Sequence, residues 1–126
     1  MGALPKMSSF VSRLNGIVLI VATGLIHLIR VPHHFEIAPY LGWLFIANFV
    51  GSLVAAVGIY RGTVWGWLLG VLIATASFVL FLVSRTIGLP ATHHELVGHW
   101  STLGIISLIV EGLFVALYVS VTALRR

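Results

Sequence analysis

Histidine and glutamate side chains concentrate in two short stretches of the chain. Residues 31–40 read VPHHFEIAPY and residues 89–101 read LPATHHELVGHWS; together with His27 they hold all six histidines and two of the three acidic residues. Imidazole nitrogens and carboxylate oxygens suit Cu(II), Zn(II) and Fe(II). The chain has no cysteine and both methionines lie near the amino terminus, so a thiolate or thioether Cu(I) site is excluded at these two stretches. Transition-metal binding is therefore the first chemistry that these residues suggest.

The run THHELVGH, residues 92–99, comes close to the HExxH motif of zinc hydrolases. In that motif the two histidines are four residues apart and share one helix face, with the glutamate as general base. His94 and His99 are five residues apart, and Gly98 disfavours a regular helical turn. The spacing therefore argues against a zinc hydrolase. Glu95 and His99 are four apart and would share a face if this segment formed a short interfacial helix.

One helical turn cannot supply the three or four ligands of a transition-metal site. We therefore predict that the ligands of a copper, zinc or iron ion come from both stretches and from the end of the first apolar segment. The candidate ligands are His27, His34, Glu36, His94, Glu95 and His99.

Glu111 lies deep inside the last apolar segment. A carboxyl group at that depth is costly unless it has a partner, so it marks a candidate functional site. Its expected partners are His27, Arg30, Arg85 or Asn48. In the alternative interpretation, a Glu111–Arg85 pair only locks the bundle.

Haem binding is a second use of histidine within a membrane. His27 would be one axial ligand, and His94 or His99 the other, with one haem near the outer surface. A di-iron oxygenase is excluded because its characteristic histidine boxes are absent from the sequence.

These residues must be positioned by helices in a lipid bilayer. The chain has 126 residues, of which 60% are hydrophobic and 8% charged. Four apolar segments, at about residues 14–30, 41–60, 65–88 and 102–124, are each near the ~20 residues that cross a bilayer as a helix. The sequence therefore predicts an all-α integral membrane four-helix bundle, with residues 1–126 forming a single domain.

The basic residues indicate the orientation of this bundle. Arg30 and Arg85 fall on one side, and the other five basic residues fall on the opposite side if the chain crosses four times. By the positive-inside rule both termini are cytoplasmic, and the short connections make neighbouring helices antiparallel. Because the basic residues are scattered at helix ends and form no stripe, nucleic-acid binding is not expected. The five residues are Lys6, Arg13, Arg61, Arg125 and Arg126.

The runs HLIRVPHHFEIAPYLGWLF (27–45), SRTIGLP (84–90) and ELVG (95–98), together with Glu111, resemble a family of small four-helix membrane proteins of actinobacteria and related bacteria. The resemblance covers the last three-quarters of the chain. It implies a multi-pass protein of the bacterial plasma membrane, and no activity, because the family is functionally uncharacterised. The positions that match the family pattern are His27, Pro32, His34, Phe35, Arg85, Gly88, Pro90, Glu95, Gly98 and Glu111.

Four histidines depart from the family pattern, namely His33, His93, His94 and His99. They look like additions in the connections, so the resemblance favours a smaller inner set of His27, His34, Arg85, Glu95 and Glu111.

Three functional hypotheses follow from the sequence. The first is a divalent transition-metal site used in metal handling or in a metal-dependent step at the outer membrane face. The second is a non-catalytic accessory subunit of a larger membrane complex, such as a respiratory or photosynthetic assembly. The third is a haem-carrying electron-transfer protein. A homo-oligomer is compatible with all three.

Overall fold

The computed structural model describes residues 9–124, and within this range the secondary structure is entirely helical. The chain forms four long helices, α2 (Phe10–Ile29), α4 (Pro39–Tyr60), α5 (Val64–Thr86) and α6 (Thr102–Leu124). A short helix, α3 (Val31–Ile37), lies between α2 and α4. The four long helices have the length and apolar composition needed to cross a membrane. The predicted all-helical chain with four apolar segments is confirmed.

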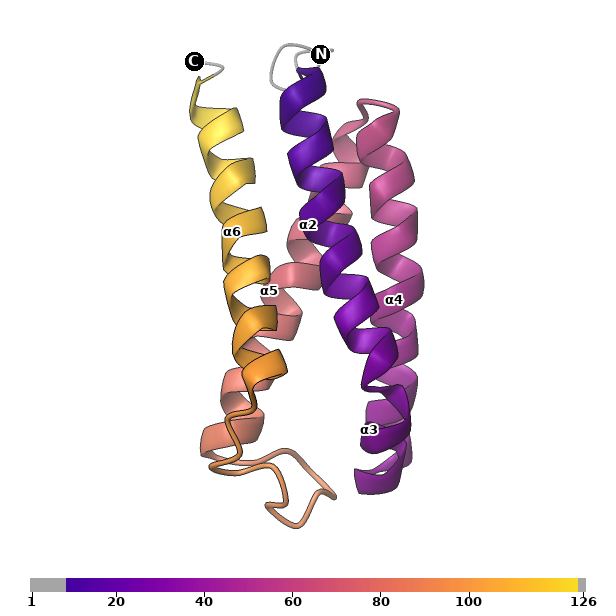
Figure 1. Ribbon diagram of the computed structural model, residues 1–126, viewed down its shortest axis with the longest axis vertical. Coiled ribbons are helices and arrows are strands. Elements are labelled where there is room, and N and C mark those ends of the chain that lie inside the picture. The colour runs from indigo at the N-terminus through magenta and orange to yellow at the C-terminus, as the bar shows by residue number, and fades with distance from the viewer. Residues whose placement is uncertain (1–8, 125–126) are drawn as a thin grey trace.

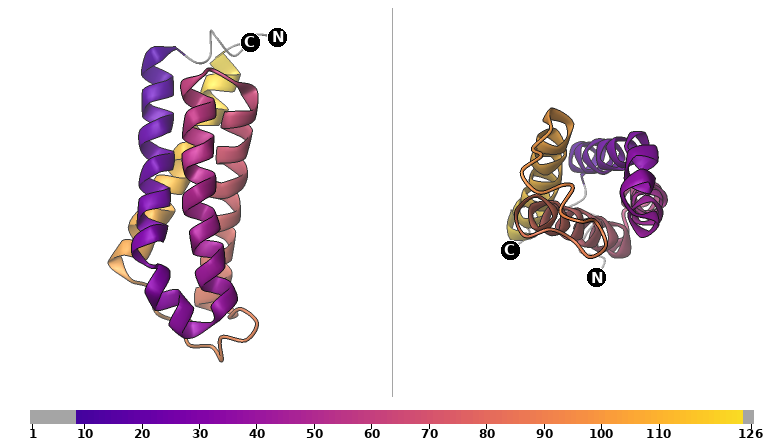
Figure 2. Two further views of the ribbon diagram at one scale, coloured as in Figure 1. Left: turned by 90° about the vertical axis from the view of Figure 1, so that its right-hand side faces the viewer. Right: turned by 90° about the horizontal axis from the view of Figure 1, so that it is seen from below.

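The four long helices form a ring in which α2 packs between α4 and α6, and α5 packs between α4 and α6 on the opposite side (Figure 2). The start of α2 and the end of α6 lie at one end of the bundle (Figure 1). The other end carries α3 and the segment 87–101. We call this second end the loop end.

The first helix begins four residues earlier than the predicted residue 14. Ser9 caps it, because its hydroxyl oxygen accepts a hydrogen bond from the backbone N–H of Ser12 at 3.2 Å. Hydropathy alone placed the boundary at the first long apolar run and missed this capping residue.

Helix α3 occupies a stretch that the sequence interpretation treated as a loop. Pro32 stands in its first turn, where a backbone N–H has no helical partner to lose. At Ala38 the backbone is extended, with φ −160° and ψ 132°, and Pro39 then begins α4. This break folds α3 back along α4, with the Phe35 ring lying against the backbone of Gly42. One consequence is that His34 faces the interior of the bundle.

Helices α4 and α5 approach most closely near the end opposite α3. A methyl group added at Gly58 would lie 2.6 Å from the Cα atom of Gly66, so each position requires glycine. Next to this crossing, Trp67 and Phe114 stack with ring centroids 5.7 Å apart, and Ile20 and Ile59 are fully buried beside them. The main apolar core therefore lies at this end.

The segment 87–101 forms turns at the loop end. Ala91, His93 and His94 have positive φ angles of 60°, 52° and 60°, which no helix contains. The interfacial helix considered for Glu95 and His99 is therefore wrong. The segment is fixed by hydrogen bonds to the bundle and by Leu96, which is buried against Ala38 and Leu41.

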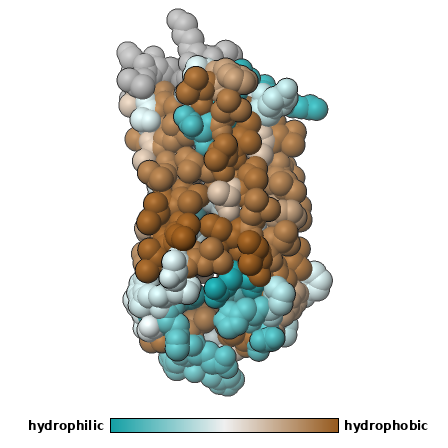
Figure 3. Space-filling model, in the orientation of Figure 1, coloured by the Kyte–Doolittle hydropathy of each residue, from teal (hydrophilic) through white to brown (hydrophobic). Residues whose placement is uncertain are grey.

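The surface of the bundle is apolar along most of its length. Hydrophobic residues cover the upper and middle parts in Figure 3, and hydrophilic residues gather at the loop end. This distribution suits a lipid environment around the long helices, with α3 and the segment 87–101 at a membrane surface.

Candidate functional site

A cavity of about 410 Å³ lies in the half of the bundle nearest the loop end. All five helices and the segment 87–101 contribute to its wall, and most of the lining is apolar. Besides Tyr40, whose hydroxyl donates to the carbonyl oxygen of Pro90 at 2.6 Å, eight polar side chains reach this wall among the apolar ones. They are His27, His34, Asn48, Ser77, Ser84, Arg85, Ser107 and Glu111.

The mouth of the cavity lies between α4 and α5. The lining residues that are exposed on these two helices are Tyr40, Leu44 and Ala47 on α4, and Ala76 and Leu80 on α5. The lining residues of α2 and α6 are all buried. The opening therefore faces the side of the bundle, where lipid chains would surround it, and the segment 87–101 covers the loop end.

A hydrogen bond marks where this opening stops. Asn48 of α4 donates from Nδ2 to the Ser77 hydroxyl of α5 at 2.6 Å. Ser52, one turn further along α4, donates to Asn48 Oδ1 at 3.3 Å. The bond joins the two helices, which diverge toward the loop end (Figure 1).

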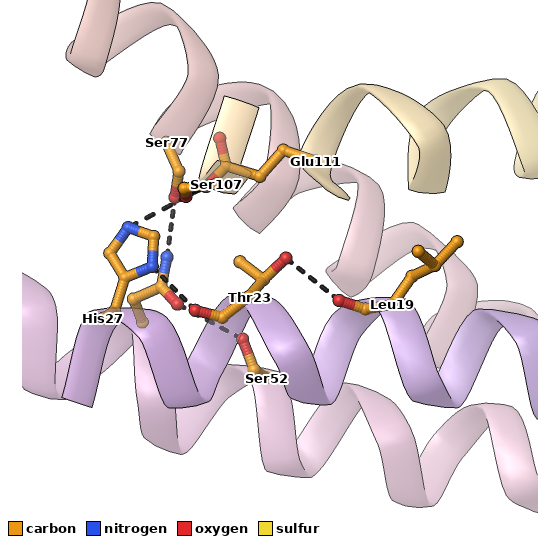
Figure 4. Close-up of polar contacts among 8 residues, drawn as sticks. Leu19, Thr23, His27, Ser52, Ser77, Ser107 and Glu111 are labelled. Atoms are coloured by element: carbon orange, nitrogen blue, oxygen red, sulfur yellow. Dashed lines mark hydrogen bonds and ion pairs between the residues drawn. The ribbon is translucent and has the colours of Figure 1, made fainter. Parts of the chain in front are cut away.

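His27 projects from α2 toward α6 (Figure 4). Its Nδ1 lies 2.8 Å from the carbonyl oxygen of Thr23. Because a carbonyl can only accept, Nδ1 carries the hydrogen, and a neutral ring then presents an Nε2 lone pair to the interior. That Nε2 lies 3.9 Å from Oε2 of Glu111.

His34 has the same arrangement on α3. Its Nδ1 lies 2.9 Å from the carbonyl oxygen of Arg30, so Nε2 is again the free nitrogen. The ring of Phe45 lies beside both imidazoles, with centroid distances of 4.7 Å to His27 and 3.8 Å to His34. Burial, followed by the positive charges of His33, Arg30 and Arg85, lowers the pKa of His34 to about 4, against the opposing effect of the Arg30 hydrogen bond. His34 is thus a neutral donor and acceptor at neutral pH.

Glu111 is 1% exposed and lines the cavity from α6. Ser107, one turn earlier, donates a hydrogen bond to its Oε2 at 2.7 Å (Figure 4). The other carboxyl oxygen, Oε1, is buried and has no hydrogen-bond partner in the described part of the chain. Of the four partners expected for Glu111, His27 is the one whose side chain approaches it, at 3.9 Å. No ion pair joins it to Arg85 within residues 9–124, so the locking pair considered from the sequence does not form.

Arg85 stands near the end of α5 and is 6% exposed. Its Nε donates to the carbonyl oxygen of His99 at 2.8 Å, and one terminal nitrogen donates to the Ser84 hydroxyl at 2.7 Å. The guanidinium also lies 4.2 Å from the centroid of the Phe81 ring. Arg85 therefore connects α5 to the segment 87–101 while facing the cavity.

The structure divides the set of predicted metal ligands. His27 and His34 line the cavity, whereas Glu36, His94, Glu95 and His99 are exposed and do not line it. Within residues 9–124, no three histidine or acidic side chains are grouped so that they could hold a metal ion. His94 and His99, the anticipated opposite ligands of a haem on His27, likewise lie on the exposed turns.

Several cavity residues were missed by the sequence interpretation. Ser107 precedes Glu111 by four residues, and this spacing could have identified it as a partner on the same helix face. Ser77 and Phe45 carried no comparable signal, because their roles depend on how α4 and α5 are rotated toward the cavity.

The chain was compared with protein-family models, curated proteins and solved structures, and none of them matches.

Proposed function

We propose that this is an integral membrane protein whose cavity binds a lipophilic molecule with a polar head. One observation carries the proposal: a largely apolar cavity opens between the lipid-facing surfaces of α4 and α5 and contains buried polar groups, including an unpartnered oxygen of Glu111. A buried polar atom without a partner is costly, so a ligand that pairs with it gains affinity.

The size and lining of the cavity support a small amphiphile. Ligand sites are typically about 300–1,000 Å³, mostly apolar, with a few convergent polar groups. A molecule dissolved in the bilayer would enter sideways past Leu44 and Leu80. Its chain would lie against the apolar wall and its head among the polar side chains of the interior.

We further propose that neighbouring helices run antiparallel in a bacterial plasma membrane with both termini cytoplasmic. The start of α2 and the end of α6 lie at the end of the bundle opposite the loop end, and Arg13 and Arg61 lie at that same end, as the positive-inside rule expects; Lys6, Arg125 and Arg126 are outside the described residues. In this orientation the cavity is in the outer half of the membrane.

A divalent transition metal is the second candidate ligand. His27 and His34 each donate Nδ1–H to a backbone carbonyl and leave Nε2 free, which is the usual arrangement of metal-binding histidines. The two rings and Glu111 would need further ligands from the bound molecule or from a second subunit. Metal analysis and a visible spectrum of the purified protein test this candidate and the haem hypothesis together. Co-purification with large membrane proteins tests the accessory-subunit hypothesis.

The proposed function is tested by binding measurements in nanodiscs. The probes share one twelve-carbon chain and differ in the head: dodecyl phosphate, dodecanol and dodecylamine, each measured by equilibrium dialysis against empty nanodiscs. We expect saturable binding of at least one probe beyond the uptake by empty discs.

Two matched variants place this binding in the cavity. Ala76→Trp fills the mouth, whereas Ala116→Trp adds the same bulk to an exposed position of α6 outside the cavity lining. We expect Ala76→Trp to weaken binding at least about tenfold and Ala116→Trp to leave it unchanged. Absence of saturable binding for all three probes, or equal loss in both variants, would overturn the proposed function.

A further inference from the structure

A small hollow of about 30 Å³ adjoins the cavity on the side between α2 and α6. Among its lining residues are Arg30 between α2 and α3, Arg85 of α5, and Ser101 and Gly104 at the start of α6. The two arginines come from opposite sides of the ring of helices.

The positive charge at this hollow has no acidic counterpart in the described part of the chain. The one contact there between a basic and an acidic side chain is the 3.9 Å approach of His27 Nε2 to Glu111 Oε2, and no carboxylate lies within ion-pair distance of Arg30 or Arg85. Both arginines act electrostatically on the ring of His34, so the two charges are concentrated in one region. Arg85 is buried and Arg30 is half-buried, and a buried cation without a counter-ion is costly, most of all beside hydrocarbon.

The start of α6 adds to this positive field. The hydroxyl oxygen of Ser101 accepts from the backbone N–H of Gly104 at 3.0 Å, and its carbonyl oxygen accepts from the N–H of Ile105 at 3.0 Å. The helix therefore begins beside the hollow, and its amino-terminal end carries a partial positive charge that favours anions.

Among the described residues, no acidic side chain lines the hollow to neutralise its positive charge. Glu36 and Glu95 are exposed, and Glu111 is the one acidic residue that lines the larger cavity. Glu111 does not line the hollow and lies one helical turn beyond Ser107, which does.

We infer that the ligand of the cavity is an anionic amphiphile whose head binds between Arg30 and Arg85. This inference rests on the proposed function and names the class of its ligand. The hollow and the cavity share part of their lining, so a ligand whose head binds between the arginines can place its hydrocarbon chain in the cavity. The lining residues common to both are His27, His34, Phe45, Phe81, Arg85 and Ser107. The head can be a phosphate or a carboxylate, because both accept paired hydrogen bonds from guanidinium.

The charge preference is measured with the same three probes. We expect dodecyl phosphate to bind at least about tenfold more tightly than dodecanol and dodecylamine. Inorganic phosphate alone distinguishes an amphiphile from a free ion, and we expect it to bind far more weakly than dodecyl phosphate. Equal binding of inorganic phosphate, or of all three twelve-carbon probes, would overturn the inference. Equal binding of the three probes would still leave the proposed function standing.

The role of the arginines is tested by substitution. Arg30→Gln removes one charge from the hollow, and Arg61→Gln removes one charge from an exposed position at the other end of α4. We expect Arg30→Gln to weaken dodecyl phosphate binding at least about tenfold while dodecanol binding stays unchanged, and Arg61→Gln to change neither.

Arg85 requires a second, charge-conserving substitution, because this residue also holds the segment 87–101 through its hydrogen bond to the His99 carbonyl. Arg85→Lys keeps the charge, so it should retain more of the phosphate preference than Arg85→Gln does in variants that show a cooperative thermal transition. A phosphate preference unaffected by Arg30→Gln would overturn the inference whatever the Arg85 variants show.

Discussion

The imidazole of His34 stacks on the ring of Phe45, with a centroid distance of 3.8 Å and an interplanar angle of 21°. His34 is 3% exposed, and its Nδ1–H donates a hydrogen bond to the Arg30 carbonyl oxygen. A second proton on this ring would place a charge in a largely apolar region that already faces two arginines. Burial and the neighbouring positive charges therefore favour neutral His34.

This preference makes stability depend on pH. The pKa of His34 is lowered from 6.5 to about 4, so the unfolded chain binds the proton more tightly than the folded one. Stability contributed by His34 is complete above about pH 6.5 and is lost as the pH falls toward 4. At pH 5 the expected loss is about 2 kcal/mol relative to pH 7.

Thermal unfolding in detergent at pH 7 and pH 5 measures this loss. His34→Gln should reduce the difference between the two pH values by about 2 kcal/mol, whereas His33→Gln, at an exposed position, should keep it. The same pH dependence in the wild-type protein and in His34→Gln would show that His34 does not cause it.

Ser107 and Glu111 form a polar pair that can be separated by a double-mutant cycle. Ser107→Ala should lower the free energy of unfolding by about 1 kcal/mol, because it leaves both oxygens of the carboxyl without a hydrogen bond. In a Glu111→Leu background the same serine substitution should cost almost nothing. Chemical or thermal unfolding in micelles gives the four values.

Ser120→Ala is the control for this cycle. Its hydroxyl bonds only to the carbonyl of Leu117 on an exposed face, and its removal should change stability by less than about 0.5 kcal/mol in either background. A cost of Ser107→Ala that persists without Glu111 would contradict the pairing.

The close approach of α4 and α5 predicts opposite effects for two glycines. Gly58→Ala should destabilise the bundle by about 2 kcal/mol, because the added methyl group would lie 2.6 Å from the Gly66 backbone. Gly112→Ala should be neutral or stabilise by up to about 1 kcal/mol, because its methyl group would meet Phe78 at 3.8 Å and alanine favours a helix. Melting curves followed by circular dichroism compare the two, and a stable Gly58→Ala would contradict the close crossing.

The proposed orientation can be tested with single cysteines, because the natural chain contains none. Ser9 lies at the start of α2 and His93 lies on the exposed turns of the loop end. With a membrane-impermeant maleimide, His93→Cys should be labelled on intact cells and Ser9→Cys only after permeabilisation. The reverse pattern would place the cavity in the inner half of the membrane.

The four long helices could be predicted from the sequence because an apolar run of about 20 residues has few alternatives in a bilayer. Helix α3 was missed because seven residues with two histidines and a glutamate carry no such hydropathy signal. Its formation depends on Pro32 in the first turn and on the packing of Phe35 against Gly42, which is a contact between two elements.

The candidate site could be predicted only in part. His27 and Glu111 were identified because polar residues within apolar runs are rare. The family resemblance added to them His34 and Arg85, which line the cavity, and Glu95, which is exposed and does not. Which of them meet depends on the rotation of each helix, and the sequence did not choose between His27 and Arg85 as the partner of Glu111. The grouping with Glu36, His94, Glu95 and His99 relied on nearness along the chain, and the turns of the segment 87–101 expose the last three. The metal assignment and the family resemblance stay predictions.

The close contact of α4 and α5 at Gly58 and Gly66 is the point about which the two helices would rotate to widen the mouth of the cavity. Leu44, at the mouth, is fourteen residues from Gly58 along α4, or about 21 Å at 1.5 Å per residue. One degree of rotation about the crossing would therefore displace the mouth by about 0.4 Å. Opening the site sideways by a few ångströms would require a small scissoring of the two helices that breaks the Asn48–Ser77 hydrogen bond, while the Trp67–Phe114 core beside the close contact stays almost still. Access of the ligand to the cavity would then depend on the packing of Gly58 against Gly66, at the end of the bundle opposite the cavity.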